Sequence, residues 1–454
     1  MKPNHHSASR PPPSAFFSLQ AFRLSGFFLG ATLALCALNT LNAQNTLQLG
    51  AHTFTPTQKT YGGTPVIPLW KAQKPTSSQT KAAGFPVLKD AQHVTVWSPA
   101  NRGEGGFSHY AALIFHNGRF YAMWANHWHG EDAPGQRILY TTSSDARTWA
   151  PPAEVFPPPC PIGKERDTGL YFRPDNWAVA DGKLYALAQI PRAKGVKPYL
   201  IAREVAGDGA LGEPFLMGDL PENTPLPSCM PGPRKNPALA AKIMKYYEDN
   251  DMITWAPQPG SKVPTRGIDK AVMATPFTFR SKDGPVMFLR DMTPRNVEEG
   301  RQSNRLYVSY PDGKGGWTPP YPTDIPCANA RAQARTLPDG RVLLTGNQIA
   351  HTFDAGLGFM TRDPLTLAIS PDGTTFTHAF ALRSSGSAVL KHRFPGITGR
   401  NLGYGYPSMI IHDGTVYVLY SVNKEDMAIT IVPLDSITTA MSDAQEKPRR
   451  KKPQ

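Results

Sequence analysis

Cysteine is scarce in this sequence, with four among 454 residues. Neither a Cys-X-X-Cys pair nor a Cys/His cluster at zinc-binding spacing occurs. A disulfide-rich scaffold and a zinc module are therefore excluded, and no metal site is expected. No cofactor motif occurs either. A structural calcium ion is left open, although no EF-hand-type loop indicates one.

Long hydrophobic runs are also absent, with one exception at the N-terminus. Basic residues up to Arg23 precede an apolar run from Leu24 to Leu41, and Leu41-Asn42-Ala43 has the small-residue pattern of a signal-peptidase site. This pattern predicts a bacterial-type export signal and a secreted or periplasmic protein, with a retained membrane anchor as the alternative. No later stretch is apolar enough to span a bilayer, so no membrane span is expected after signal removal. The three cysteines that remain allow at most one internal disulfide.

Acidic residues are outnumbered, because 48 Lys and Arg face 35 Asp and Glu, for a net charge of +13. About half of this excess lies in residues 1–43 and in the tail from Glu446. The rest of the chain keeps a modest positive charge, which favours an anionic substrate or simply a soluble surface. Nucleic acid is not expected as a partner, because a phosphate-binding face needs clustered basic residues.

Five segments share one pattern, in which a short apolar strand, an Asn-Gly or Asp-Gly turn and an aromatic-rich strand follow one another. Each predicts a β-hairpin, because these dipeptides supply the positive φ of a type I′ turn. The abundance of proline (46) and glycine (39) agrees with a chain of many tight turns. The hairpins are 112–125, 177–189, 277–291, 334–348 and 409–422.

The hairpins recur at intervals of 64, 102, 56 and 74 residues between their turns. Such spacing predicts a radial β repeat, in which sheets of four strands cover one another's faces around a ring. Five visible hairpins, one hidden in the 102-residue interval and strand material near His93–Trp97 predict an all-β, six-bladed β-propeller, with seven blades as the alternative. The composition of residues 236–248 predicts a helix in a loop between blades.

A second element follows several hairpins and carries a family resemblance. Residues 143–149 (SSDARTW) and 370–376 (SPDGTTF) place an Asp in a turn ahead of an aromatic residue, and 310–317 does so more loosely. These segments resemble the Asp boxes of the sialidase-like (BNR) β-propeller family, over roughly residues 85 to 435. The resulting division is a signal peptide (1–43), an extended leader (44–84), the propeller (85–440) and a basic disordered tail (441–454).

Histidines and arginines are the candidate site residues that the pattern itself supplies. His109 begins the first strand of a hairpin, and His127 and His129 follow its second strand, which suits proton transfer near neutral pH. Loop histidines bonded to backbone carbonyls are the alternative. Guanidinium groups converging on a propeller axis would hold the carboxylate of an acidic sugar, or would pair with neighbouring Asp residues. These arginines are Arg173, Arg290, Arg331 and Arg362.

The family resemblance implies further roles. Sialidase-like enzymes use a Tyr nucleophile assisted by a carboxylate, which implies Tyr404 or Tyr406 with Glu425. Local similarity to propeller polysaccharide lyases, such as ulvan lyases, implies proton transfer by His109 and His129 with Tyr171.

The primary prediction is a glycoside hydrolase that cleaves an acidic oligo- or polysaccharide. A polysaccharide lyase acting by β-elimination on a uronic-acid polymer and a non-catalytic carbohydrate-binding propeller are the alternatives. The predicted catalytic residues are His109, His129, Tyr171, Tyr406 and Glu425, and the predicted binding residues are Arg173, Arg290, Arg331, Arg362, His127 and Tyr404.

Overall fold

The structure is a computed structural model, and the chain divides into two units, 1–45 and 46–454. The predicted signal peptide and the cysteines at 160 and 229 lie outside the described residues. Within the described residues, no helix is long and apolar enough to cross a membrane. The described residues are 46–61, 64–76, 81–159, 169–190, 199–219, 234–252, 274–290, 305–328, 330–349, 362–386, 388, 390–399 and 401–446.

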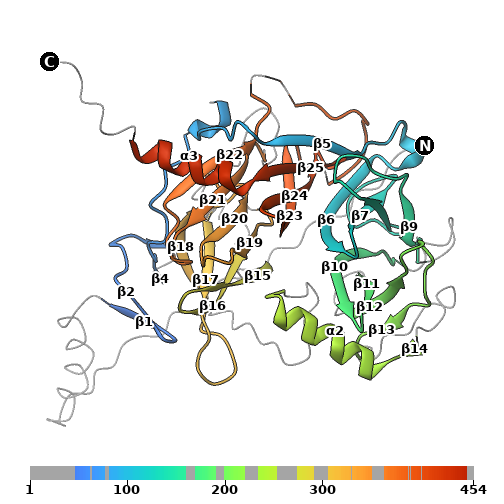
Figure 1. The fold of residues 1–454 in the computed structure, drawn as a ribbon, viewed down its shortest axis with the longest axis horizontal. Coiled ribbons are helices and arrows are strands. Elements are labelled where there is room, and N and C mark those ends of the chain that lie inside the picture. The colour runs from blue at the N-terminus through green and yellow to red at the C-terminus, as the bar shows by residue number, and fades with distance from the viewer. Residues whose placement is uncertain are drawn as a thin grey trace, which may run out of the picture. The chain divides into compact units, whose positions relative to one another are not determined.

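Five antiparallel sheets of four principal strands dominate the described residues (Figure 1). Each sheet is one propeller blade, and the blades follow one another in chain order. Blade 1 consists of β6 (Phe107–His116), β7 (Arg119–His127), β8 (Arg137–Ser143) and β9 (Ala153–Phe156). Blade 2 consists of β10 (Arg173–Ala180), β11 (Lys183–Ile190), β12 (Tyr199–Val205) and β13 (Phe215–Leu216), with β14 (Arg234–Lys235) added in parallel.

The other three blades repeat this arrangement. Blade 3 consists of β15 (Ala274–Ser281), β16 (Gly284–Arg290), β17 (Arg305–Ser309) and β18 (Tyr321–Pro326). Blade 4 consists of β19 (Gln333–Thr336), β20 (Val342–Gly346), β21 (Leu365–Ser370) and β22 (His378–Arg383). Blade 5 consists of β23 (Tyr404–His412), β24 (Thr415–Val422), β25 (Asp426–Pro433) and β5 (Gln92–Trp97).

The predicted blade number of six, with seven as the alternative, is wrong. Strand β5 forms no blade of its own, because it pairs with β25 as the outer strand of blade 5 and so closes the ring with an N-terminal segment (Figure 1). The described part of the 102-residue interval contains β12, β13, β14 and a helix instead of a further hairpin. Each of the five hairpins therefore stands for one whole blade.

All five predicted hairpins are present, and each supplies the two innermost strands of a blade. Asn117, Asp181 and Asp413 adopt φ values of 46°, 50° and 44°, and the glycine after each also has a positive φ. These values are those of the type I′ turn that the dipeptides predict. Apolar side chains from facing sheets pack between the blades, as between blades 1 and 2 and between blades 4 and 5.

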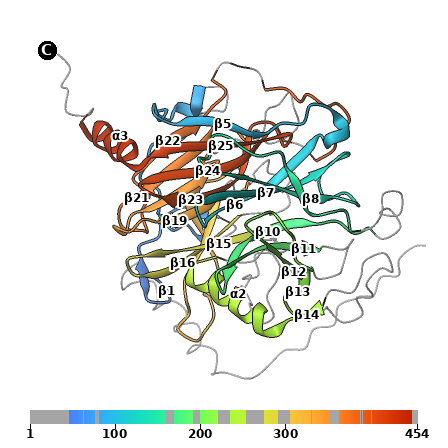
Figure 2. The same ribbon diagram turned by 45° about the vertical axis from the view of Figure 1, so that its right-hand side comes forward.

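Short strands and helices outside the five sheets complete the described structure. In the predicted leader, β1 (Leu47–Leu49) pairs with β2 (His52–Phe54), and β3 (Thr60–Tyr61) pairs with β4 (Thr64–Pro65). Ile67 then bridges to the outer strand of blade 3, and a 3-10 turn, η1 (Lys81–Gly84), follows. The predicted helix is α2 (Pro237–Asp249), which Asn236 caps and which packs on blade 2 (Figure 2). Helix α3 (Leu434–Glu446) crosses the predicted boundary at residue 440.

The Asp boxes lie between the third and fourth strands of blades 1, 3 and 4. In blade 4, the Oδ1 atom of Asp372 accepts hydrogen bonds from the Ser370 hydroxyl (2.9 Å) and from the amides of Thr374 and Thr375 (both 2.8 Å). Phe376 behind the turn is fully buried. The box thus satisfies the amides of its own turn and anchors an aromatic side chain in the blade.

We expect Asp372→Ala to lower the free energy of unfolding by about 1–2 kcal/mol, because it leaves two turn amides without their acceptor. Urea denaturation followed by tryptophan fluorescence measures this loss. Asp372→Asn is the matched control, since its amide oxygen can still accept the same bonds. An equal loss in both variants would show that the charge, and not the acceptor oxygen, stabilises the turn.

Candidate active site

Bulges in the innermost strands direct side chains toward the propeller axis. The segment from His109 to Ala112 in β6 advances three residues while the paired segment of β7 advances two, so β6 carries one extra residue. Strands β10, β15 and β23 each carry the same one-residue insertion. A bulge of this kind bends a strand and redirects a side chain. The bulges of β6 and β23 place Tyr110 and Tyr406 with φ of 61° and 56°, and their rings pack edge to face at 5.4 Å.

Tyr406 is surrounded by arginines from two other blades. Arg290, at the end of β16, donates from Nη1 to the Tyr406 hydroxyl oxygen (2.6 Å). The Arg362 guanidinium lies 4.8 Å from the centre of the Tyr406 ring, ahead of β21. Arg331, ahead of β19, is close enough to act electrostatically on both Tyr406 and Arg290. The three arginines and Tyr406 are 6 to 8% exposed, so their charges act with little screening by water.

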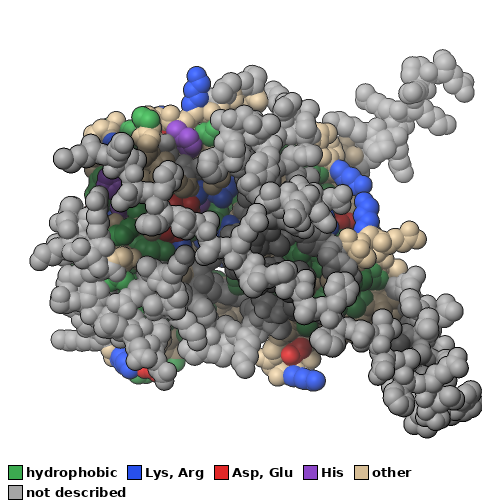
Figure 3. Space-filling view, turned by 180° about the vertical axis from the view of Figure 1, so that it is seen from behind, with side chains coloured by type: hydrophobic (Ala, Val, Ile, Leu, Met, Phe, Trp, Pro, Cys, Tyr) green, Lys and Arg blue, Asp and Glu red, His purple; other side chains and the backbone are tan. Residues whose placement is uncertain are grey.

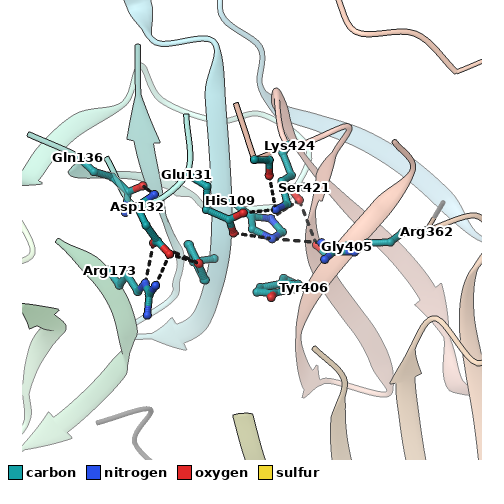
Figure 4. A network of polar contacts seen from close by, with 12 residues as sticks. His109, Glu131, Asp132, Gln136, Arg173, Arg362, Gly405, Tyr406, Ser421 and Lys424 are labelled. Carbon is teal, nitrogen blue, oxygen red and sulfur yellow. Dashed lines mark hydrogen bonds and ion pairs between the residues drawn. The ribbon is translucent and has the colours of Figure 1, made fainter. Parts of the chain in front are cut away.

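His109 is fully buried beside this group and belongs to a hydrogen-bonded chain (Figure 4). Ser421 on β24 donates to the Gly405 carbonyl (3.2 Å), so its oxygen can accept from His109 Nδ1 (2.7 Å). The opposite ring nitrogen, Nε2, then accepts from Arg362 Nη1 at 3.3 Å. Burial, reinforced by Lys424 and the arginines, holds the pKa of His109 well below its usual range. His109 is therefore a neutral imidazole with Nε2 as its basic atom.

A buried ion pair lies on the other side of His109. Lys424, in the turn after β24, donates from Nζ to Glu131 Oε2 (2.5 Å) and to the Gly399 carbonyl (2.7 Å). Glu131 Oε1 lies 4.0 Å from His109 Nε2. Burial raises the pKa of Glu131, but Lys424 and Arg362 outweigh this effect and lower it overall. The carboxylate is therefore charged at neutral pH and partly compensates the cations of the site.

Asp132, the next residue, joins the first two blades. Arg173, at the start of β10, donates to both of its carboxylate oxygens, with Nε at 2.7 Å from Oδ1. The Tyr110 hydroxyl donates to the same carboxylate (3.3 Å), and the Arg173 guanidinium lies 5.4 Å from the Tyr171 ring centre. Burial raises the pKa of Tyr171 to about 12. The charges of Arg173 and Asp132 therefore compensate each other in this half of the site.

The two tyrosines at equivalent bulges have opposite electrostatic environments. Burial, with Glu131 and Asp132 nearby, raises the pKa of Tyr110 well above its usual value. Burial also raises that of Tyr406, but Arg290 and Arg362 outweigh it and lower the pKa of Tyr406 overall. Paired groups whose pKa values are moved apart are a feature of acid–base sites. Deprotonation is therefore easier at Tyr406 than at Tyr110.

Two of the sequence-predicted residues lie elsewhere. The Tyr404 ring packs against Tyr420 in the core between blades 4 and 5, with the Arg383 guanidinium 4.9 Å from its centre. Glu425 accepts hydrogen bonds from the amides of Arg393 (3.0 Å) and Phe394 (3.1 Å) and so holds a loop in place. Glu131 is the carboxylate beside Tyr406, where its charge counteracts the effect of the arginines on the pKa of the tyrosine.

The two loop histidines also lie apart from the tyrosine and arginine group. His127 Nδ1 accepts from the amides of His129 (3.0 Å) and Gly130 (3.2 Å), and its Nε2 lies 3.2 Å from the Pro134 carbonyl oxygen. These bonds fix the turn after β7, which matches the alternative interpretation of the loop histidines. The exposed His129 follows, with its ring centre 5.5 Å from that of His127.

The structure thus brings His109, Tyr406 and the predicted arginines together from all five blades. Four further residues of the candidate site had no role assigned from the sequence, namely Tyr110, Glu131, Asp132 and Lys424. The signal for Tyr110 was present, because it stands at the same position of its hairpin as Tyr406. On the face seen in Figure 3, basic and acidic side chains lie close together among hydrophobic ones. No group of His, Cys, Asp and Glu suited to a metal ion occurs in the described part of the chain.

Comparisons with known proteins agree with this architecture. The family model for a BNR repeat-like domain matches residues 234–418, and a model for an N-terminal beta propeller matches residues 95–177. A search of curated protein sequences gives no significant match.

Solved structures give matches at low sequence identity. A sialidase structure is 19% identical, with a TM-score of 0.60 over 81% of this chain and 35% of that one. A mutant Trypanosoma rangeli sialidase displaying trans-sialidase activity is 12% identical, with a TM-score of 0.46 over 82% and 62%. A leech intramolecular trans-sialidase is 10% identical, with a TM-score of 0.43 over 77% and 71%.

The present chain thus spans about a third of the length of the first of these structures, and its likeness to that structure concerns the fold alone. The Asp boxes, the radial sheets and the BNR repeat-like match all lead to one classification. The chain is a β-propeller with a BNR repeat-like domain over residues 234–418, and its fold is similar to that of a sialidase.

Proposed function

We propose that the protein is an exported glycoside hydrolase that cleaves an acidic sugar from a glycan. The observation that carries this proposal is the buried Tyr406 hydroxyl, which receives a hydrogen bond from Arg290 and is flanked by Arg331 and Arg362. The sialidase-like fold supports a glycosidase, while the arginines support an anionic substrate. The predicted signal peptide supports export.

The proposed mechanism starts with the carboxylate of the sugar between the three arginines. Guanidinium groups bind carboxylates through paired, charge-assisted hydrogen bonds, and their burial strengthens this attraction. The bound sugar places its anomeric carbon next to the Tyr406 oxygen. Binding energy from the carboxylate therefore serves to position the reacting bond.

Tyr406 then acts as the nucleophile. Its oxygen forms a bond to the anomeric carbon while the glycosidic bond breaks, and the proton that leaves the Tyr406 hydroxyl is transferred to the leaving oxygen. In the second step, a water molecule attacks the anomeric carbon and gives a proton to His109 Nε2. The bond from that carbon to Tyr406 breaks, and His109 returns the proton to the released Tyr406 oxygen. The neutral state of His109 suits this role as a base.

One observation favours β-elimination as a second candidate. The basic Nε2 of His109 lies 3.3 Å from Arg362, so a sugar carboxylate on that arginine would bring its α-carbon proton near a base. The arginines would stabilise the charge that develops on the carboxylate. The product would then contain an unsaturated ring.

Incubation with a panel of acidic glycans separates these functions. The panel contains sialyllactose, polygalacturonate, alginate, ulvan and heparin, and the assay follows both reducing sugar and ultraviolet absorbance. We expect new reducing ends without absorbance from an unsaturated ring. Absorbance that rises with each new reducing end would identify a lyase. Retention of an acidic glycan without either product would identify a binding protein.

A further inference from the structure

A second hollow opens beside the candidate active site, on the loop that follows β7. It is a cavity of about 660 Å³, a size typical of small-molecule sites. Trp128, His129, Pro134 and Pro158 line it with aromatic and apolar surface, and Arg102 stands at its edge. No function has been assigned above to this cavity.

The walls of the cavity are held in place before any ligand binds. The Trp128 indole nitrogen donates to the Gly103 carbonyl (2.7 Å), and the Arg137 guanidinium lies 4.6 Å from the Trp128 ring centre. Arg137 is itself fixed by hydrogen bonds to Asn126 (2.9 Å) and Glu154 (2.5 Å). A pre-organised aromatic wall loses little conformational entropy on binding, so its contact area contributes directly to affinity.

The charge of the cavity indicates the kind of ligand. Among the described residues, its lining includes Arg102 and no carboxylate. The Arg102 side chain is exposed and donates from Nε to the Trp128 carbonyl (3.4 Å). Within the described residues it forms no ion pair, so it can contact an anion. Sugar rings combine apolar faces with polar rims, which suits an aromatic wall next to a hydrogen-bond donor.

The backbone joins this cavity to the tyrosine and arginine group. Phe107, two residues before His109 on β6, pairs directly with His127, which also lines the cavity. The same loop continues from Trp128 to Glu131 and Asp132 of the candidate active site. Trp128 and Glu131 are three residues apart, a distance that the chain spans in at most about 11 Å. Both sites therefore lie within reach of one oligosaccharide.

We propose that this cavity is a second subsite, which binds another acidic sugar unit of the same glycan. The proposal rests on the proposed function, because it assumes that an acidic sugar occupies the tyrosine and arginine group. It adds that the substrate is an acidic chain of at least two charged units. Trp128 packs on the ring of the second unit, and Arg102 binds its carboxylate.

The test compares binding to acidic sugars of increasing length. The arrays carry galacturonate, glucuronate, mannuronate and sialic acid, each as a monomer and as oligomers, and the protein carries Tyr406→Phe so that bound chains are not cleaved. We expect oligomers of one acidic sugar to bind roughly tenfold more tightly than its monomer. Adding Arg102→Ala or Trp128→Ala should abolish this advantage and leave monomer binding unchanged.

Arg119→Ala is the matched control, because it removes the same charge from an exposed position at the other end of β7. It should retain the advantage of the longer chains. Arg102→Ala also keeps the test valid if Trp128→Ala does not fold. An oligomer advantage that survives Arg102→Ala, or monomers and oligomers that bind equally, would overturn the subsite while the proposed function stands. If the Tyr406→Phe protein binds none of the acidic sugars, monomers included, both the subsite and the proposed function would be overturned.

Discussion

Tyr406→Phe should lower kcat/KM on the cleaved acidic glycan by at least about 1,000-fold, because it removes the attacking oxygen of the proposed mechanism. The phenyl ring retains its packing against His109 (ring centres 4.0 Å apart) and Tyr110. The fold should therefore survive, with a loss of stability of about 1.5–3 kcal/mol for the hydrogen bond from the charged Arg290 side chain. Steady-state kinetics and a thermal melt measure the two effects.

Tyr110→Phe is the matched control for this prediction. Tyr110 occupies the equivalent bulge with nearly the same backbone conformation, but its hydroxyl donates to Asp132, whereas that of Tyr406 accepts from Arg290. We expect this variant to keep activity within about tenfold. Similar losses in both variants would show that the nucleophile is not Tyr406, and would leave β-elimination with His109 as the base to be tested next.

Lys424→Met should lower the free energy of unfolding by about 3–5 kcal/mol at neutral pH. Lys424 is 3% exposed, and its removal leaves the Glu131 carboxylate without its closest cation. Lysine and methionine adopt the positive φ of this turn (55°) at similar cost, so the variant reports on charge. Urea denaturation gives the loss, and the double variant Lys424→Met/Glu131→Gln should recover more than half of it.

The pH dependence distinguishes this charge effect from lost packing. In the wild-type protein the pKa of Glu131 is lowered, so its contribution to stability is present above its ordinary pKa of 4.5 and is lost as the pH falls further. In Lys424→Met, burial should raise this pKa instead. The variant should then lose stability as the pH rises from about 4.5 to 7. A difference between the two proteins that stays constant across this range would contradict the assignment.

Local sequence patterns predicted the repeating parts of the fold because those parts are stabilised locally. The Asn-Gly and Asp-Gly dipeptides specify the turns of the hairpins, and the Asp box satisfies its own amides, as at Asp372. The α2 helix has its cap and its first-turn proline in the sequence itself. These signals need no knowledge of distant residues.

The number of blades could not be predicted in this way. Strand β5 (QHVTVW) alternates polar and apolar residues like any half-buried strand. Whether it begins a new blade or completes an old one depends on which sheet edge it meets. Its partner β25 lies more than 300 residues further along the chain. The pairing that closes the ring forms only between assembled sheets. The sequence therefore provided no reason against a sixth hairpin hidden in the 102-residue interval.

The candidate site divides along the same line. Hairpin position indicated that arginines and a tyrosine would stand near the ends of inner strands and face the propeller axis. Which carboxylate joins them depends on how the blades meet, since Glu131 and not Glu425 lies beside Tyr406 and His109. Contacts between separate blades depend on bulges, loop paths and buried ion pairs, and the energies of these features arise only when the ring has closed.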